Sequence, residues 1–192
     1  LRRDWSSDVC SSDLHGGATE GVIHDSTRMT TEKTRIICDH QQVVRVDSER
    51  TQALGEDHEA ALIGLLDDEI RSRSLDAIIV EDYNKGTVTE SLLAGVAELG
   101  RRHGIHVALD PHPSNRASTQ GISTMTPNRS EAFAMTGVYP CPQTLPIEND
   151  EGLMDVVACL QSKWAPEYLL ITLGAEGMAL FQHDQPPHHI PT

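Results

Sequence analysis

The sequence predicts a layered α/β fold with a largely parallel sheet, and three observations lead to this prediction. After residue 53, stretches with the apolar spacing of an amphipathic helix alternate with short runs typical of buried strands. Strands that alternate with helices pair in parallel, because each helix returns the chain to the same end of the sheet. The 192 residues are 38% hydrophobic and only 4% aromatic, which suits one domain with a mainly aliphatic core.

The first predicted element is a β-hairpin. Two β-prone runs, residues 33–38 and 41–47, flank a two-residue polar break. In the second run Arg45 and Asp47 alternate with valines, which gives the hairpin one charged face. Residues 53–71 follow with the apolar spacing of an amphipathic helix.

The middle of the chain predicts two strands with a helix between them. Residues 75–80 are an apolar run, expected to form a buried strand that leads into a polar loop. Thr89 is a favoured cap for the next helix, and Gly104 is a favoured stop. A second buried strand is expected over residues 105–110. It ends at Pro111, because proline has no amide hydrogen for the ladder.

The last third of the chain continues the alternation. A short strand is expected over residues 122–126, followed by a helix and a proline-rich surface loop at 139–150. The next helix is expected over about 151–163. Residues 168–172 and 178–181 then predict the last two strands, with a glycine-containing turn between them.

The composition excludes several classes of partner. A formal net charge of −14 argues against binding to nucleic acid or to an anionic membrane through bulk charge. No apolar run approaches the roughly 20 residues that a membrane-spanning helix needs. The four cysteines include no Cys-x-x-Cys pair, and such scattered thiols fit a reducing, cytoplasmic setting better than a disulfide framework.

The first 14 residues lack the pattern of a native element. They have no apolar core of the kind found in signal peptides, and their repeated Ser-Ser-Asp has neither helical nor strand spacing. The stretch resembles a translated sequencing adapter. We therefore treat residues 1–14 as non-native and residues 15–192 as the domain.

Two strand ends are expected to place polar side chains on one rim of the sheet. Asp110 ends one strand, and Asn128 and Glu131 follow the strand that stops at Pro127. Open α/β sheets bind ligands at the carboxyl ends of their strands. Asn128 and Glu131 have two interpretations. Their spacing is that of a helix capping box, and their oxygens also suit Mg²⁺ held through water beside a nucleotide's phosphates.

Two further stretches permit both a structural and a functional interpretation. Thr172-x-Gly174-x-x-Gly177 follows a strand, where glycine suits a tight turn and also lets backbone amides approach a phosphate. Lys85 lies in an acidic loop at a strand end, where it is either solvated or binds a phosphate. The spacings of a Rossmann dinucleotide site and of a P-loop are both absent from the sequence.

Several segments resemble one protein family. Met-Thr-Pro-Asn-Arg-Ser-Glu-Ala at 125–132, together with Leu-Ile-Thr-Leu-Gly-Ala-Glu-Gly at 170–177, resembles the nucleotide half of the ribokinase-like (PfkB-type) sugar kinases. Within that family, Thr-Glu-Lys-Thr-Arg at 31–35, Gln-Gln-Val-Val-Arg-Val-Asp at 41–47 and Glu-Asp-Tyr-Asn-Lys-Gly at 81–86 are similar to the kinase domain of bacterial heptose-phosphate kinase/adenylyltransferases.

The resemblance, which covers roughly residues 20–192, implies a three-layer ribokinase-like sandwich with a mostly parallel sheet. The hairpin at about 33–47 is its small β lid. The implied cofactors are ATP and Mg²⁺, and the implied substrate is a sugar phosphate. The implied site residues are Asn128 and Glu131 for Mg²⁺ and phosphates, Thr172, Gly174 and Gly177 for the nucleotide, Asp110 and Lys85 near the transferred group, and Arg35, Arg45, Asn84 and Lys85 for the substrate.

Departures from the family pattern set further expectations. The family's Gly-Gly segment near the N-terminus is absent, and its Gly-Ala-Gly-Asp segment, with the general base Asp, is expected beyond Thr192. Asp110-Pro111-His112 stands where many heptose kinases have Asp-Pro-Lys. We therefore expect a partial kinase domain that is inactive by itself and leaves one apolar face of its sheet uncovered.

The expected parent reaction is ATP-dependent phosphorylation of D-glycero-β-D-manno-heptose 7-phosphate to the 1,7-bisphosphate, in ADP-heptose synthesis for lipopolysaccharide. Two alternatives stay open. One is a ribokinase-like kinase for another sugar or a nucleoside, and the other is a nucleotide-binding fragment without activity. A lid strand such as 41–47 offers an edge to a second copy, so a homodimer through the lid is a further expectation.

Overall fold

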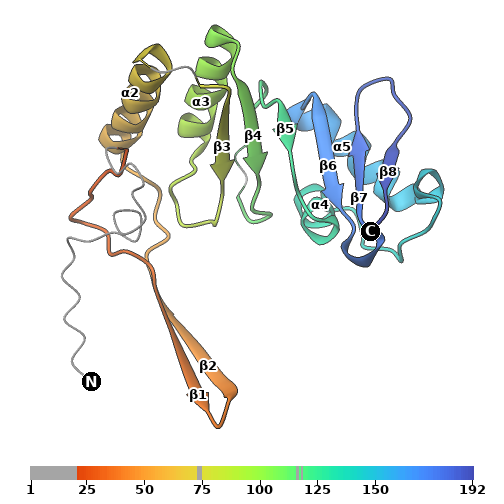
Figure 1. Ribbon diagram of the computed structural model, residues 1–192, viewed down its shortest axis with the longest axis horizontal. Helices are drawn as coiled ribbons and strands as arrows, with labels where there is room; N and C mark the ends of the chain where they lie inside the picture. The colour runs from red at the N-terminus through yellow and green to blue at the C-terminus, as the bar shows by residue number, and fades with distance from the viewer. Residues whose placement is uncertain (1–20, 73–74, 116, 118) are drawn as a thin grey trace.

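Figure 1 shows the computed structural model of the chain, which describes residues 21–72, 75–115, 117 and 119–192. The adapter-like stretch, residues 1–14, lies outside these residues. The strands are β1 (Glu32–Cys38), β2 (Gln41–Ser48), β3 (Ala77–Glu81), β4 (His106–Asp110), β5 (Thr124–Met125), β6 (Tyr168–Thr172), β7 (Met178–Phe181) and β8 (His188–Ile190). The helices are α2 (Glu56–Ser72), α3 (Glu90–His103), α4 (Arg129–Thr136) and α5 (Glu151–Trp164), with 3-10 turns η1 (Ile147–Asn149) and η2 (Gly174–Glu176).

The central sheet has six strands in the order β3-β4-β5-β6-β7-β8. The strands from β3 to β6 are parallel, whereas β7 and β8 run antiparallel to their neighbours. Short connections precede β7 and β8, and a connection of that length joins antiparallel strands only. The predicted α/β class with a mostly parallel sheet is confirmed, and β8 is a strand that the prediction missed.

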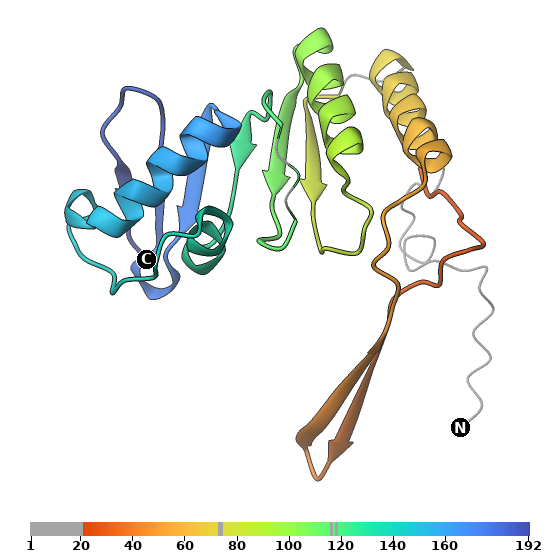
Figure 2. The ribbon, with the colours of Figure 1, turned by 180° about the vertical axis from the view of Figure 1, so that it is seen from behind.

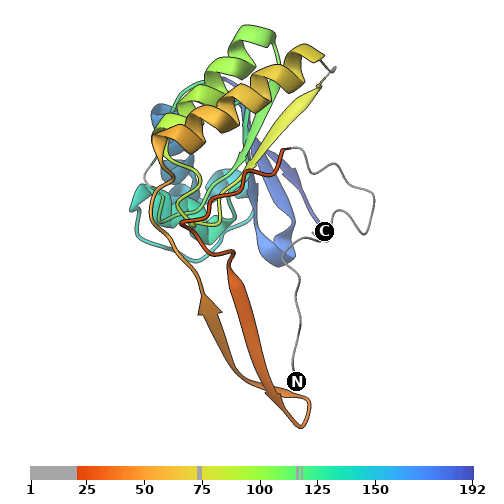
Figure 3. The ribbon, with the colours of Figure 1, turned by 90° about the vertical axis from the view of Figure 1, so that its left-hand side faces the viewer.

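In the described part of the chain, all the α-helices lie on one face of the sheet (Figures 2 and 3). That face forms the core, where Val107, Met125 and Ile171 are fully buried. On the other face Ile79 is 71% exposed, so the run 75–80 was wrongly predicted to be a buried strand. The run is apolar at successive positions, so its sequence does not show that helices cover only one face of this strand. The expected uncovered face is thus present, and helices and sheet form two layers of the sandwich.

Helix α3 confirms each of the local signals that predicted it. Thr89 caps the helix by accepting a hydrogen bond from the Leu92 amide at 3.1 Å, and Gly104 ends it with a φ of 68°. The predicted leucine and valine side chains are buried. Gly95 allows α2 to pack closely against α3, because a Cβ there would lie 2.7 Å from Cδ1 of Ile63.

Two elements differ most in length from their predictions. Helix α2 begins at Glu56 rather than at residue 53, and β5 is shorter than the predicted strand over 122–126. Regular hydrogen bonding is lost first at the ends of elements, so apolar spacing alone places such ends loosely. None of the helices in the described residues is long and apolar enough to cross a membrane.

The hairpin of β1 and β2 projects beyond the edge of the domain where the parallel strands end (Figure 1). Its strands are antiparallel, and Asp39 and His40 form the turn with φ values of 46° and 69°. Arg35 and Arg45 are partners across the hairpin, which confirms a charged face. Ile36, on the other face, is 51% exposed, so the hairpin presents both faces to solvent in this single chain.

Candidate functional site

The parallel strands all end at one edge of the sheet (Figure 1), and β3, β4 and β6 each end on a polar residue there. Glu81 at the end of β3 is the register partner of Asp110 at the end of β4. Asn128, just beyond β5, forms a bridge with Thr172 at the end of β6. We call these four residues and Glu131 the rim. The structure therefore brings Asp110, Asn128 and Glu131 to one edge, as the sequence predicted.

The rim concentrates negative charge around Asp110. Burial raises the pKa of Asp110, and the charges of Glu131 and Glu81 raise that pKa further, while a hydrogen bond from Thr126 Oγ1 at 3.3 Å lowers it. Carboxylates that repel one another favour a bound cation. Within the described residues, no group of three or more His, Cys, Asp or Glu side chains is arranged to hold a metal ion. Mg²⁺ keeps several water ligands and needs only one or two carboxylates beside a phosphate, a requirement that the rim carboxylates are able to meet.

Asn128 and Glu131 form a complete capping box at the start of α4. Asn128 Oδ1 accepts a hydrogen bond from the Glu131 amide at 2.9 Å, and Glu131 Oε2 accepts one from the Asn128 amide at 2.8 Å. The pair therefore forms the helix cap that its structural interpretation predicted. Glu131 Oε1 and Asn128 Nδ2 make no hydrogen bond with any described residue, so both side chains keep a polar atom for a ligand.

The two glycines of the Thr172–Gly177 turn differ in their surroundings. Both have positive φ, 64° at Gly174 and 86° at Gly177, a conformation that favours glycine. A Cβ at Gly177 would lie 2.0 Å from the Ile190 carbonyl oxygen, so the approach of β8 alone requires glycine there. A Cβ at Gly174 would meet nothing within 4 Å. Gly174 is thus the position of this turn where a ligand can approach the backbone.

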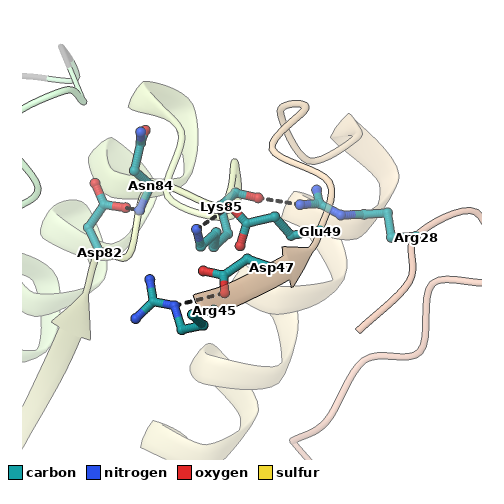
Figure 4. A network of polar contacts seen from close by, with 7 residues as sticks. All are labelled: Arg28, Arg45, Asp47, Glu49, Asp82, Asn84 and Lys85. Atoms are coloured by element: carbon teal, nitrogen blue, oxygen red, sulfur yellow. Dashed lines mark hydrogen bonds and ion pairs between the residues drawn. The ribbon is translucent and has the colours of Figure 1, made fainter. Parts of the chain in front are cut away.

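The loop that carries Lys85 is held against the base of the hairpin (Figure 4). Lys85 Nζ lies 2.7 Å from Glu49 Oε1, and the Arg28 guanidinium donates to the Lys85 carbonyl oxygen. The Leu54 amide donates to the Gly86 carbonyl oxygen at 2.7 Å. Sequence reasoning missed Glu49 and Arg28, because nothing in the sequence pairs them with a loop more than thirty residues away.

The other predicted substrate residues occupy two places. Asn84 has a φ of 53°, and its backbone amide donates a hydrogen bond to Asp82 Oδ1 at 2.7 Å. The Asn84 side chain makes no hydrogen bond with the described residues. Arg45 lies on β2 and pairs with Asp47 at 2.8 Å (Figure 4). Arg35 forms no ion pair with any described residue and lies beside Arg45 on the hairpin. Of the four predicted substrate residues, Lys85 and Asn84 lie in the loop next to the rim, and Arg35 and Arg45 lie on the hairpin.

A buried ion pair supports the first turn of α4, and sequence reasoning missed it. Asp150 is 2% exposed and lies 2.8 Å from Arg129, the residue that follows Asn128. Asp150 also caps α5 by accepting from the Leu153 amide at 3.0 Å. The position of Asp150 just before the helix predicted over about 151–163 was the signal in the sequence that could have identified it as a cap. The pair links the 139–150 loop to the helix that carries Asn128 and Glu131.

No family model matches the chain. Among curated proteins, the bifunctional protein HldE of Geobacter sulfurreducens is 36% identical over 172 residues, which are 90% of this chain and 33% of that protein. The bifunctional protein HldE of Trichlorobacter lovleyi is 36% identical over 177 residues, 92% of this chain and 34% of that protein. The chain thus spans about one third of the length of these relatives.

Solved structures give the fold. The crystal structure of Sa239 superposes with a TM-score of 0.65 at 16% identity, over 94% of this chain and 55% of that one. Arabidopsis thaliana ribokinase complexed with ribose and ATP gives 0.50 at 18% identity, over 80% and 45%. Escherichia coli phosphofructokinase-2 in complex with potassium gives 0.51 at 15% identity, over 77% and 46%. This likeness shows a ribokinase-like fold.

Proposed function

We propose that this chain supplies the nucleotide rim and the substrate lid of an ATP-dependent sugar-phosphate kinase. The observation that carries the proposal is the meeting of two sets of groups at one edge of the sheet. Rim carboxylates and the open Gly174 turn lie on one side, and Lys85 at the hairpin base lies on the other. The HldE relatives and the ribokinase-like fold support this reading.

The rim is the proposed nucleotide side. Thr172, Gly174 and Gly177 line the nucleotide, and the Gly174 backbone is free to approach its phosphates. Asn128 and Glu131 hold Mg²⁺ through water, and Asp110 adds negative charge beside it. The ion, when bound, would offset charge on the phosphates and on the transferred group. The protein's own contribution is to hold these groups on strand ends and a helix start, which the core keeps rigid.

The hairpin and the loop after β3 form the proposed substrate side. Lys85 and Asn84 meet the sugar phosphate, and the lid brings Arg35 and Arg45. The substrate that we propose is D-glycero-β-D-manno-heptose 7-phosphate, phosphorylated at its anomeric hydroxyl. The resemblance of residues 31–35, 41–47 and 81–86 to heptose-phosphate kinases gives the direction of this proposal, and the cations in an otherwise acidic chain supply its chemistry.

The described residues offer no convincing general base. Asp110 is the nearest carboxylate, but its raised pKa and its place among rim carboxylates suit water or cation binding better. Loss of a general base alone lowers phosphoryl transfer by roughly 10²–10⁴-fold. We therefore propose that the 192-residue polypeptide binds nucleotide and substrate without measurable turnover.

Two measurements on the purified chain test this function. Calorimetric titration with MgATP should show binding, and ³¹P NMR with heptose 7-phosphate or ribose should show no product above background. Absence of MgATP binding would refute the nucleotide rim. Phosphorylation of ribose but not of the heptose phosphate would favour a kinase for another sugar, and brisk turnover of either would place a base within residues 15–192.

We also propose that the lid pairs with a second copy of the chain. Ile36, Val44 and Val46 expose an apolar hairpin face of the kind that a partner covers. Sedimentation equilibrium tests this pairing, since a monomer at all concentrations would exclude it.

A further inference from the structure

The Lys85–Glu49 contact joins the substrate loop to the end of the lid. The two charged atoms are 2.7 Å apart, and the side chains are only 32% and 22% exposed. An ion pair with this much burial is stronger than an exposed one, because solvent screens it less. Lys85 is therefore not a free cation in this structure, although it is the loop residue expected to meet a phosphate.

The network around this contact contains two polar atoms without partners. Glu49 Oε2 and Arg28 Nη1 are both buried and have no hydrogen-bond partner among the described residues. Both side chains nevertheless contact Lys85, Glu49 through the ammonium group and Arg28 through the carbonyl oxygen (Figure 4). Buried polar atoms left unpaired cost free energy. If the Glu49 side chain turned from Lys85 to Arg28, Glu49 Oε2 could accept a hydrogen bond from Arg28 Nη1, and both atoms would gain a partner.

Open space lies on the Arg28 side of this network. A cavity of about 670 Å³, lined in part by Arg28, Leu54 and Thr87, lies beside the network. The Arg28 side chain therefore borders open space. The 49–54 segment, in contrast, is held against the loop by the hydrogen bond from the Leu54 amide to the Gly86 carbonyl oxygen. The two backbones also approach closely, since a Cβ at Gly86 would lie 2.0 Å from the Gln52 carbonyl oxygen.

The neighbouring carboxylates are committed to other partners. Asp47 pairs with Arg45, and Asp82 accepts from the Asn84 amide and from Asn115. Among the described residues, Glu49 is thus the carboxylate that pairs with the Lys85 ammonium.

We propose that Glu49 is a positioning residue that reserves Lys85 for a phosphate group, with Arg28 as its alternative partner. The inference rests on the proposed function and names the residues that select a phosphorylated sugar. A phosphate dianion carries more charge than the Glu49 carboxylate and can displace it from Lys85. A neutral sugar hydroxyl cannot. When Lys85 turns to phosphate, Glu49 turns to Arg28, and both unpaired atoms gain a partner.

The test compares two substitutions that each remove one negative charge from the base of the hairpin. Glu49→Gln frees Lys85, whereas Glu32→Gln, at the register partner of Ser48, leaves the Lys85–Glu49 pair intact and serves as the matched control. Calorimetric titration with inorganic phosphate should give a Kd about fivefold to tenfold lower for Glu49→Gln than for the parent. The Kd of Glu32→Gln should stay within about twofold of the parent value. Glu49→Asp keeps a carboxylate and should bring the Kd back toward the parent value.

Arg28→Gln examines the partner exchange. Glutamine is neutral and shorter than arginine, so it cannot form an ion pair with the Glu49 carboxylate. We expect a phosphate Kd several-fold higher than in the parent, and no effect of this substitution when Glu49 is already glutamine. An equal effect in both backgrounds would overturn the exchange.

Equal phosphate affinities for Glu49→Gln and Glu32→Gln, or weaker binding by Glu49→Gln than by the parent, would overturn the reservation of Lys85. Melting temperatures check that each variant folds. MgATP titration of the same samples keeps the two proposals apart. The nucleotide rim consists of other residues than Lys85 and Glu49. A chain that never binds MgATP therefore refutes the kinase, while the phosphate comparison still decides the role of Glu49.

Discussion

Glu131→Gln separates the two roles that the start of α4 can have. In the parent, Glu131 Oε2 accepts a hydrogen bond from the Asn128 amide at 2.8 Å, and Oε1 has no partner among the described residues. Glutamine is an accepted residue at this position of a capping box, because its amide oxygen accepts the same bond. The substitution therefore keeps the cap and removes only the charge that would face a cation.

The two roles predict different magnitudes. If Glu131 only caps, Glu131→Gln changes the free energy of unfolding by no more than about 0.5 kcal/mol and leaves MgATP binding unchanged. Glu131→Ala breaks the reciprocal bond and costs about 1 kcal/mol, or roughly 2–4 °C in melting temperature for a chain of this size. If Glu131 also holds Mg²⁺ through water, Glu131→Gln weakens MgATP binding by about 10- to 100-fold.

The assay pairs a melting curve with a calorimetric MgATP titration for each variant. Glu90→Gln is the matched control, since Glu90 lies in the first turn of α3 and carries the same charge at a helix start. Asn128→Ser adds a second cap-preserving variant that lacks the amide group. Unchanged MgATP affinity in Glu131→Gln, together with a lowered melting temperature in Glu131→Ala, would leave only the cap and refute the proposed metal role.

Three other substitutions test other parts of the molecule. Lys85→Met should raise the Kd for a sugar phosphate much more than for the unphosphorylated sugar, and an equal change for both would mean that Lys85 does not bind the substrate phosphate. Asp150→Ala should lower the free energy of unfolding by about 3–5 kcal/mol in urea, because it leaves Arg129 buried without its partner, whereas a loss near 1 kcal/mol would reduce Asp150 to a cap. Asp110→Asn should raise the melting temperature at pH 7. The folded pKa of Asp110 is raised above 3.8, so its stabilising contribution is complete below that pH and is lost as pH rises through the folded value. The difference from the parent should therefore vanish in acid, and a difference that persists below about pH 3.8 would contradict this origin.

Local signals in the sequence predicted the elements that depend on local chemistry. The bounds of β6 and β7 match the predicted runs, and α3 has its predicted cap and stop. The rim was also predictable, since parallel strands end at one edge and Asp110, Asn128 and Thr172 each stand at or just beyond a strand end.

Contacts between distant segments were beyond such reasoning. Strand β8 is three residues between prolines, too short to show an alternation, and its existence depends on pairing with β7. Ile79 belongs to an apolar run, yet its exposure depends on what covers that face of the sheet. Glu49 and Lys85 are 36 residues apart, and only the folded chain places them together.

The separation of lid and core has an evolutionary consequence. Hairpin side chains such as Val44 contribute little to the core, so most substitutions there cost within about 0.5 kcal/mol and selection on folding ignores them. Under the proposed function, selection on the substrate and on pairing with a second copy would then govern how β1 and β2 diverge. Glu49 and Gly86 lie at the junction between the two parts, where a change alters lid and core together. Among descendants of one ancestral domain, new sugar preferences would accumulate on the hairpin while this junction changes slowly.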